Sequence, residues 1–215
     1  MPATVFFQCS NPDCSFRFPA LPIMNRCPRC GCSLVSIPEI SALADSNPRD
    51  ETKLRPLEAL LDNIRSTYNV GAMFRTSDGA GVSHLYLTGT SPTPDNLRVG
   101  KTALGAEFAV PWSWHANGLQ AAQQIKSQGK RLWALEIGPG SSSIFQAAQQ
   151  LPSEPLCLVV GNEVSGIDPG ILALCDACVW IPMQGYKRSL NVAIAFGIAV
   201  YTLRYASSMS HCGKI

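Results

Sequence analysis

The sequence predicts an α/β protein with a mostly parallel sheet, preceded by a small cysteine-rich unit, and three observations support this fold class. Strand-like apolar runs alternate with helical segments from Pro56 onward, as in parallel sheets whose strands are connected by helices. Apolar residues make up 46% of the 215 positions and charged residues only 15%, which is enough for a buried core. Five of the nine cysteines lie in the first 32 residues, so the start of the chain forms a unit of its own.

The cysteine-rich unit spans residues 1–36 and offers a closed metal site. Its close thiol pairs are Cys9 with Cys14 and Cys27 with Cys30. Four thiolates satisfy a tetrahedral Zn²⁺ ion, and so short a segment has too little core to fold without the metal. Cys32 is a spare thiol that could replace Cys30, and the spacing does not decide between them. The segment is similar to a zinc ribbon.

Bulk properties limit the location and the partners of the chain. The net charge of +2 neither requires nor excludes nucleic acid, because a local basic patch matters more than the total. No apolar run reaches transmembrane length, and the N-terminus lacks the charged head and apolar stretch of a signal peptide. We therefore expect a cytoplasmic protein, whose reducing surroundings favour metal binding over disulfides.

Residues 37–55 are rich in polar and turn-forming residues and predict a linker. The α/β domain then covers residues 56–207, and 208–215 form a C-terminal tail. Within the domain, short apolar runs predict strands and the segments between them predict helices. The predicted order is strand Leu60–Ile64, helix Val70–Ser77, strand Ser83–Leu87, loop Ser91–Lys101, helix Leu119–Ser127, strand Leu132–Ile137, helix Ile144–Gln150, strand Leu156–Val160, a helical turn after Pro169, strand Val179–Ile181 and a last helix.

The last helix is apolar on nearly every face from Leu190 to Leu203, which predicts that it is buried all round. Ser189 is well placed as its N-cap, where the hydroxyl would accept a bond from a free first-turn N–H. Asn191 is harder to explain as a cap. Two polar side chains at the N-terminus of a buried helix cost free energy to bury unless they bind a partner. Both side chains are therefore candidate site residues.

Several familiar sites are excluded by the sequence. It has neither the glycine-rich dinucleotide fingerprint after its first strand nor a P-loop. Cys175 and Cys178 have metal-like spacing but no second pair nearby, so core thiols are the better interpretation. The three histidines, His84, His115 and His211, are scattered and form no acid–base constellation.

Three stretches combine polar side chains with glycines. They are Leu61–Val82, Leu158–Asp168 and Ile181–Tyr201. The first carries Asn69 and Arg75, and the second ends a strand in a turn with Glu163. In this order they resemble the motifs of the SpoU (TrmH) group of the SPOUT superfamily, the knotted RNA methyltransferases, over roughly Pro56 to Ala206. One such motif is a weak signal, whereas three with the family's spacing are a strong one.

The resemblance implies a deep trefoil knot, in which the C-terminal segment threads through a preceding loop. It also implies that S-adenosylmethionine binds in the knotted loops through backbone and apolar contacts. The implied cofactor residues are Leu87, Thr88, Gly89, Gly161, Ile181, Met183 and Leu190. Glycines let the backbone approach a ligand closely, and Ile181 and Leu190 offer apolar faces to the adenine. Met183 is either a wall of the cofactor site or a core filler, and we favour the wall.

The reaction implied by the resemblance is methyl transfer to a ribose 2′-hydroxyl of tRNA or rRNA. Such a site must orient the hydroxyl and offset the negative charge that it develops. Arg75 is implied to act on the ribose oxygen. Because a guanidinium is a poor base, we expect it to hold the adjacent phosphate and offset that charge. Asn69 would position Arg75 or the neighbouring backbone, and Glu163 would orient its loop or pair with a basic group across an interface. Ser189 and Asn191 would hydrogen-bond the substrate and the motif loop.

The resemblance also implies RNA and a second copy of the chain as partners, since proteins of this group work as homodimers. Basic residues that flank the motifs are candidate phosphate contacts: Arg65, Arg98, Lys101, Lys187 and Arg188. Two other functions stay open: a non-catalytic RNA-binding or assembly module on the same fold, and a SPOUT enzyme that methylates a base nitrogen. The ribbon either helps to hold RNA through its arginines, Arg17, Arg26 and Arg29, or only packs against the next domain.

Overall fold

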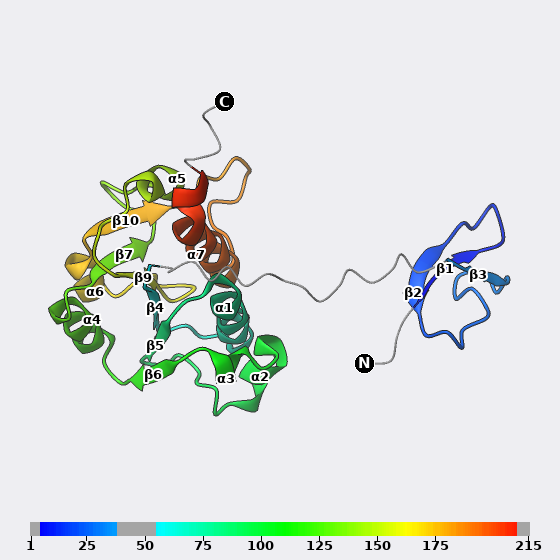
Figure 1. Cartoon of the computed structure of the whole chain (residues 1–215), viewed down its shortest axis with the longest axis horizontal. Helices are drawn as coiled ribbons and strands as arrows, with labels where there is room; N and C mark the ends of the chain where they lie inside the picture. The colour runs from blue at the N-terminus through cyan, green and yellow to red at the C-terminus, as the bar shows by residue number, and fades with distance from the viewer. Residues whose placement is uncertain (1–4, 38–54, 210–215) are drawn as a thin grey trace. The chain divides into compact units, whose positions relative to one another are not determined.

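The computed structural model describes residues 5–37 and 55–209. The chain divides into two compact units, Met1–Glu51 and Thr52–Ile215, and Figure 1 colours it from blue at the N-terminus to red at the C-terminus. The predicted linker at 37–55 and tail at 208–215 fall largely outside the described residues, so their bounds stay predictions. Within the described ranges, none of the helices has the length and apolar character needed to cross a bilayer.

The first unit is a three-stranded antiparallel sheet of order β2-β1-β3. Its strands are β1 (Val5–Cys9), β2 (Arg17–Ala20) and β3 (Leu34–Ser36). Phe7 and Cys9 of β1 are buried while their neighbours are exposed, the pattern of a strand with one covered face. The rings of Phe7 and Phe16 both pack on Phe18, with centroids 6.5 and 5.0 Å away. This aromatic group is a small core for a folded unit.

The second unit is built on a seven-stranded sheet of order β6-β5-β4-β9-β7-β10-β8, and its strands pair in parallel. The strands are β4 (Leu57–Asp62), β5 (His84–Thr88), β6 (Trp112–His115), β7 (Arg131–Leu135), β8 (Ser142–Ser143), β9 (Leu156–Val160) and β10 (Ala177–Trp180). The central strand β9 is buried at every position, as expected of a parallel strand covered on both faces. The predicted mostly parallel α/β architecture is thus confirmed.

Helices cover both faces of this sheet (Figure 1). They are α1 (Thr67–Ala80), α2 (Leu97–Ala103), α3 (Ala106–Ala109), α4 (Gly118–Ser127), α5 (Ile144–Ala147), the 3₁₀ helix η1 (Ala148–Gln150), α6 (Pro169–Leu174) and α7 (Val192–Met209). One core layer joins α1, α2 and α7 to the sheet through Phe74, Val99 and Phe196. The other layer joins α4 and α6 to it through Ile125 and Ile171. The alternation of strands and helices therefore buries the sheet between two helical layers.

Most predicted elements lie within a few residues of the observed ones, but some observed elements differ from the prediction. The predicted loop Ser91–Lys101 contains the start of α2, and the sequence predicts no element at α3, at β6 or at the two-residue strand β8. α3 has only four residues, and β6 is a short edge strand, so neither is long enough to show a clear period.

The expectation that the last helix is buried all round is wrong. Ile194 and Tyr201 are 57% and 43% exposed, because α7 packs beside α1 and keeps one side open.

The end of α1 is held by a cation from α7. Arg204 is 8% exposed, and its guanidinium donates to the carbonyl oxygens of Ala80, Gly81 and Arg55. Carbonyls at a helix C-terminus lack partners within the helix, and a cation there complements the helix dipole. Gly81 closes the helix in the left-handed conformation, with φ 66°. These bonds fix α1, which carries the predicted site residues Asn69 and Arg75, relative to α7.

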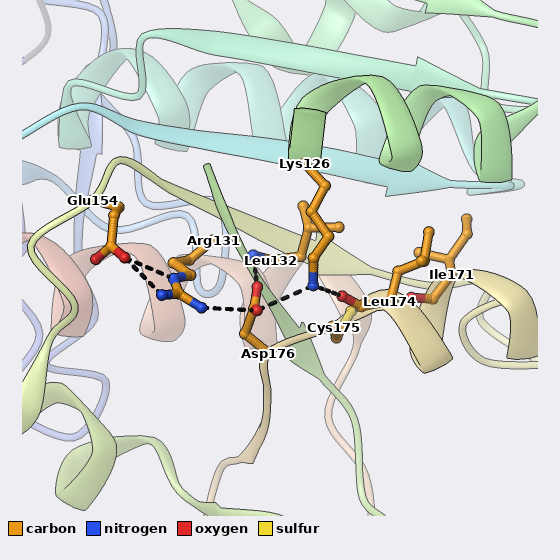
Figure 2. Close-up of polar contacts among 8 residues, drawn as sticks. All are labelled: Lys126, Arg131, Leu132, Glu154, Ile171, Leu174, Cys175 and Asp176. Atoms are coloured by element: carbon orange, nitrogen blue, oxygen red, sulfur yellow. Dashed lines mark hydrogen bonds and ion pairs between the residues drawn. The ribbon is translucent and has the colours of Figure 1, made fainter. Parts of the chain in front are cut away.

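A cluster of ion pairs ties together the amino ends of the central strands (Figure 2). Asp176, just before β10, accepts hydrogen bonds from Lys126 Nζ at 3.0 Å, Arg131 Nη1 at 3.2 Å and Leu132 N at 2.9 Å. Arg131 also donates to Glu154 Oε1 through Nε at 3.0 Å and Nη2 at 2.7 Å. The Arg131 guanidinium lowers the pKa of Glu154 to about 2. The cluster therefore occupies the amino ends of these strands, whereas ligands of open parallel sheets bind at the carboxyl ends.

The contact between α1 and α2 leads to a stability prediction. A Cβ at Gly71 would lie 2.1 Å from Thr102 Oγ1 and 2.3 Å from the Val99 carbonyl oxygen, so the two helices would have to separate. Gly71→Ala should lower the free energy of unfolding by about 1–3 kcal/mol, although alanine by itself favours a helix by about 1 kcal/mol. The measurement is urea unfolding followed by tryptophan fluorescence, because all four tryptophans lie in the second unit.

Gly197→Ala in α7 is the matched control. Its Cβ would meet Thr76 Cγ2 at 3.6 Å, an ordinary van der Waals contact. This variant should keep or raise the unfolding midpoint, since it gains helix propensity without a clash. Equal midpoints for the two variants would contradict the close packing of α1 on α2.

Candidate functional site

A cavity of about 390 Å³ opens at the carboxyl ends of β7, β9 and β10. The loops that follow these three strands and the first turn of α7 form its walls. Ligands of open parallel sheets bind outside the carboxyl ends of the strands, and small-molecule sites have volumes of about 300–1,000 Å³. The cavity is therefore the candidate functional site.

Arg188, a predicted phosphate contact, lines this cavity. So do seven of the predicted catalytic and cofactor residues. They are Gly161, Glu163, Ile181, Met183, Ser189, Leu190 and Asn191. The apolar ones come from the loop between β10 and α7. Gly161 permits the tight turn after β9, since a Cβ there would lie 2.3 Å from the carbonyl carbon of Gly166. In that turn Asn162 and Gly166 exchange two backbone hydrogen bonds of 3.0 Å.

A chain of hydrogen bonds joins the three polar motifs beside the cavity. Glu163 Oε1 accepts from Asn69 Nδ2 at 2.8 Å, and Asn69 Oδ1 accepts from Asn191 Nδ2 at 3.1 Å. Asn69 lies in the first turn of α1, Glu163 in the loop after β9, and Asn191 just before α7. The fold thus brings together side chains 94 and 122 positions apart. We call this set the Asn69–Glu163–Asn191 network.

Glu163 also binds the start of α1. Its carboxylate accepts from the backbone N–H groups of Arg65 at 2.9 Å and of Ser66 at 3.3 Å. Burial raises the pKa of Glu163, but the hydrogen bonds from the backbone and from Asn69 outweigh it, so the pKa lies below its ordinary value. Glu163 is therefore ionised at neutral pH and acts as a hydrogen-bond acceptor in this network.

The cap of α7 is Asn191 and not Ser189. Asn191 Oδ1 accepts from the backbone N–H of Ala193 at 2.9 Å and of Ile194 at 3.4 Å. This corrects the N-cap assignment of Ser189, because the helix begins at Val192. Ser189 lies on the cavity wall and makes no hydrogen bond with the described part of the chain. Its hydroxyl is thus available to a ligand, while Asn191 both caps α7 and donates to Asn69.

Arg75 is not part of the cavity wall of its own chain. It is exposed on α1 and forms neither a hydrogen bond nor an ion pair within residues 5–37 and 55–209. It follows Asn69 by six residues, which is about 9 Å of helix rise. Four residues further, a Cβ at Gly79 would lie 2.7 Å from Tyr201 Oη of α7. Arg75 therefore lies one turn before the Gly79–Tyr201 contact between α1 and α7, exposed and outside the cavity wall.

Leu87, Thr88 and Gly89 do not line the cavity either. Leu87 is fully buried in the core, and Thr88 Oγ1 lies 3.2 Å from Asp62 Oδ1, to which it donates. Gly89 has φ 58°, and a Cβ there would lie 2.1 Å from Asn63 Oδ1. β4 separates β5 from β9 in the sheet, so these three residues support the contact between β4 and β5.

Several residues that line the cavity were not identified as site residues from the sequence. Glu136 follows β7 and lines the cavity, with Oε1 accepting from the Ile137 N–H at 3.0 Å. Trp180 ends β10 and lines it too. Asn162 holds the loop, since its Nδ2 donates to the Asn63 carbonyl oxygen at 2.7 Å. The rule that sites lie at the carboxyl ends of parallel strands points to Glu136 and Trp180, but only once the strand order is known.

The first unit gathers four thiols at one point. The Sγ atoms of Cys9, Cys14, Cys27 and Cys30 all lie within 4.8 Å of one another. Cys9 and Cys30 are 3.4 Å apart and Cys14 and Cys27 3.9 Å apart. A tetrahedral zinc site with Zn–S bonds of about 2.3 Å needs sulfur atoms about 3.8 Å apart. The geometry fits such an ion, and Cys32 is not part of the cluster.

The second unit is similar to known RNA-modifying proteins. Residues 56–201 match the model of the SpoU rRNA Methylase family. Over 146 residues the chain is 32% identical to the 23S rRNA (guanosine(2553)-2′-O)-methyltransferase RlmP of Bacillus subtilis, covering 67% of this chain and 56% of that protein. Over 151 residues it is 30% identical to the tRNA (guanosine(18)-2′-O)-methyltransferase of Aquifex aeolicus, covering 70% of each.

A solved structure supports the same similarity. The AdoMet-bound rRNA methyltransferase of Sinorhizobium meliloti aligns with a TM-score of 0.65 and 29% identity. That alignment covers 72% of this chain and 57% of the other. The chain therefore spans little more than half of the length of this protein and of the Bacillus subtilis relative.

Proposed function

Since the chain belongs to the SpoU rRNA methylase family, we propose that it transfers a methyl group from S-adenosylmethionine to a ribose 2′-hydroxyl of tRNA or rRNA. The observation that carries this proposal is the Asn69–Glu163–Asn191 network, which joins three distant motifs beside one cavity. The names of two relatives, an rRNA and a tRNA 2′-O-methyltransferase, support a sugar oxygen as the acceptor.

The cavity has walls that fit the proposed cofactor. Ile181, Met183 and Leu190 provide apolar surface for an adenine, and the turn at Gly161 brings backbone groups to the wall. Glu136 adds a carboxylate that can accept hydrogen bonds from sugar hydroxyls. Leu87, Thr88 and Gly89 are outside this proposed site. When bound, S-adenosylmethionine supplies an electrophilic methyl group on sulfonium.

The chain's own residues have to orient the ribose and offset its developing charge. Ser189 has a free hydroxyl on the cavity wall, so it is our candidate for binding the substrate. Asn69, Glu163 and Asn191 hold the three motifs in place and act as positioning residues. Arg75 is the candidate that offsets charge on the ribose oxygen, with the proton leaving through phosphate or water.

Arg75 requires a second copy of the chain in this account, because it does not line the cavity of its own chain. We propose a homodimer formed through the open side of α1 and α7. Tyr68, Ile194 and Tyr201 are 57%, 57% and 43% exposed there, and exposed apolar patches on helices mark interaction sites. In such a dimer, the Arg75 of one protomer would serve the cavity of its partner.

Other features of the chain belong to the same proposal. The knot expected from the family would be formed by the loops that build the cavity, with α7 following the last of them. Residues 1–36 would be a zinc ribbon and 56–207 the methyltransferase domain. Reduced thiols and RNA substrates would both be found in the cytoplasm.

Zinc removal gives a prediction that separates the two units. Cys27→Ser, or chelation, should unfold the ribbon, because the metal supplies most of its stability. The second unit should stay folded, since its own core is large. Alkylation of the cysteines, read by mass spectrometry, reports on the ribbon. Tryptophan fluorescence reports on the second unit alone. A single cooperative loss of both signals would contradict the division into two units.

The proposed function is tested by titrating the purified chain with S-adenosylmethionine in a calorimeter and then adding RNA with labelled cofactor. We expect saturable cofactor binding and transfer of label to RNA. Absence of cofactor binding would leave only a non-catalytic RNA-binding or assembly module. Cavity variants such as Leu190→Arg, which place a cation beside a cationic cofactor, should abolish binding without unfolding, because Leu190 is 36% exposed.

A further inference from the structure

One face of the N-terminal sheet exposes an aromatic and a basic side chain, Phe6 and Arg17. Residues directly opposite each other in antiparallel strands share a face. The register pairs Phe6 with Pro19 and pairs Gln8 with both Arg17 and Val35. These five residues therefore form one surface, which we call the outer face. Phe7 and Cys9 point to the opposite, inner face.

The outer face is not part of the unit's core. Phe6 and Val35 are 53% and 58% exposed, whereas Phe7 and Cys9 are 6% and 4% exposed. The aromatic contacts of the unit join Phe7 and Phe16 to Phe18 and leave Phe6 out. The outer face therefore exposes two large apolar side chains, Phe6 and Val35, beside the cation Arg17, and exposed apolar patches mark binding surfaces.

The charges on the unit are complementary to a polyanion. Residues 5–37 contain three arginines, Arg17, Arg26 and Arg29, and a single acidic residue, Asp13. None of the arginines forms an ion pair within residues 5–37 and 55–209. Arg17 is exposed at the start of the edge strand β2, directly opposite Gln8 of the central strand. A protein surface that covered this face would bury an unpaired guanidinium unless it supplied a carboxylate, whereas RNA brings a phosphate with every nucleotide.

We propose that the outer face binds single-stranded RNA, with a base stacked on Phe6 and a phosphate held by Arg17. Aromatic side chains on a basic sheet are a common platform for unpaired bases. Bases within a duplex are already stacked on one another, so the surface selects single strands. The inference rests on the proposed function for its RNA substrate, and it adds a second RNA contact outside the methyltransferase unit.

The test measures binding of the full chain to a short fluorescein-labelled oligouridine by fluorescence anisotropy. Phe6→Ala should weaken binding roughly 10-fold, because stacking on one aromatic ring contributes on that order. Arg17→Ala should reduce the slope of log affinity against log salt by about 0.7, the loss of one phosphate contact on a single strand. Phe6→Trp should bind as well as the unmodified chain. In methylation assays Phe6→Ala should raise KM for RNA and leave kcat and cofactor affinity unchanged.

Ile23→Ala is the matched control, because Ile23 is 86% exposed in the same unit but lies outside the three strands. It should not change RNA affinity. The amide NMR signals of β1–β3 verify that each variant is folded.

Unchanged RNA affinity in folded Phe6→Ala would overturn the inference, as would equal binding of duplex and single-stranded RNA. A lower unfolding midpoint of the second unit in Phe6→Ala would overturn it too, since the face would then pack on that unit. An unmodified chain that transfers no methyl group would instead contradict the proposed function.

Discussion

Arg75→Ala should lower kcat for methyl transfer by about 10²- to 10³-fold, the effect of removing one group that stabilises developing charge. The affinity for S-adenosylmethionine should not change, because Arg75 lies outside the cavity wall. Stability should not change either, since Arg75 is exposed and has no partner within the described residues. Calorimetry and single-turnover kinetics measure these quantities separately. Equal losses of cofactor binding and transfer would mean that Arg75 is structural.

Mixing two inactive variants tests whether Arg75 acts across a dimer. Arg75→Ala retains an intact cavity, and Leu190→Arg retains Arg75 but has a blocked cavity. In a mixed dimer, the intact cavity of one protomer meets the Arg75 of its partner, so activity should return at one site per dimer. If Arg75 acts within its own chain, no mixture recovers activity, because each chain lacks one of the two parts. Light scattering verifies that mixed dimers form, and Arg75→Lys tests whether charge alone suffices.

Glu163→Gln should lower kcat/KM by about 100-fold, the order expected when catalytic groups shift by about 1 Å. The carboxylate accepts three hydrogen bonds, from Arg65 N, Ser66 N and Asn69 Nδ2. An amide turns one of its two acceptor ends into a donor that faces N–H groups. Asn69 and the start of α1 would then lose their common anchor. Glu154→Gln is the control, because Glu154 pairs with Arg131 at the amino ends of the strands and should leave activity unchanged.

The same carboxylate predicts a pH dependence. The pKa of Glu163 in the folded chain lies below its ordinary value, so folding favours the ionised form. Its contribution to stability is full above the unfolded pKa, about 4.3, and is lost as the pH falls through the folded pKa. The network should therefore persist at neutral pH and open only in acid. Unfolding curves measured from pH 7 down to acid give the free energy of unfolding at each pH. This free energy should fall less on acidification in Glu163→Gln than in the unmodified chain.

The fold could be predicted from the sequence wherever a segment was long and strongly patterned. The strand Leu156–Val160 matches β9 at both ends, since five consecutive apolar residues allow few other structures. The segment from Ser91 to His115 could not be predicted, because α3 and β6 depend on packing more than on local pattern. The last helix was expected to be buried because it is apolar, but Ile194 and Tyr201 are exposed on α7, and a sequence does not reveal which face meets a partner.

The candidate site could be predicted where residues are close in sequence to a motif. Gly161, Ile181 and Leu190 do share one cavity, as the resemblance implies. Leu87–Gly89 do not, because the strand order that separates β5 from the cavity is a tertiary property. Glu136 was missed for the same reason: its loop meets the others only in the folded sheet. The assignment of the cap to Ser189 failed because the choice between it and Asn191 depends on where α7 begins.

Nucleoside analysis of RNA after incubation with the protein and isotopically labelled S-adenosylmethionine is the measurement that bears most directly on the function. The labelled methyl group should appear on the sugar of a single nucleotide, and the label should vanish with Arg75→Ala and with Leu190→Arg. A labelled methyl group on a base, or label that survives both substitutions, would contradict a site in which these loops direct a methyl donor toward a ribose oxygen.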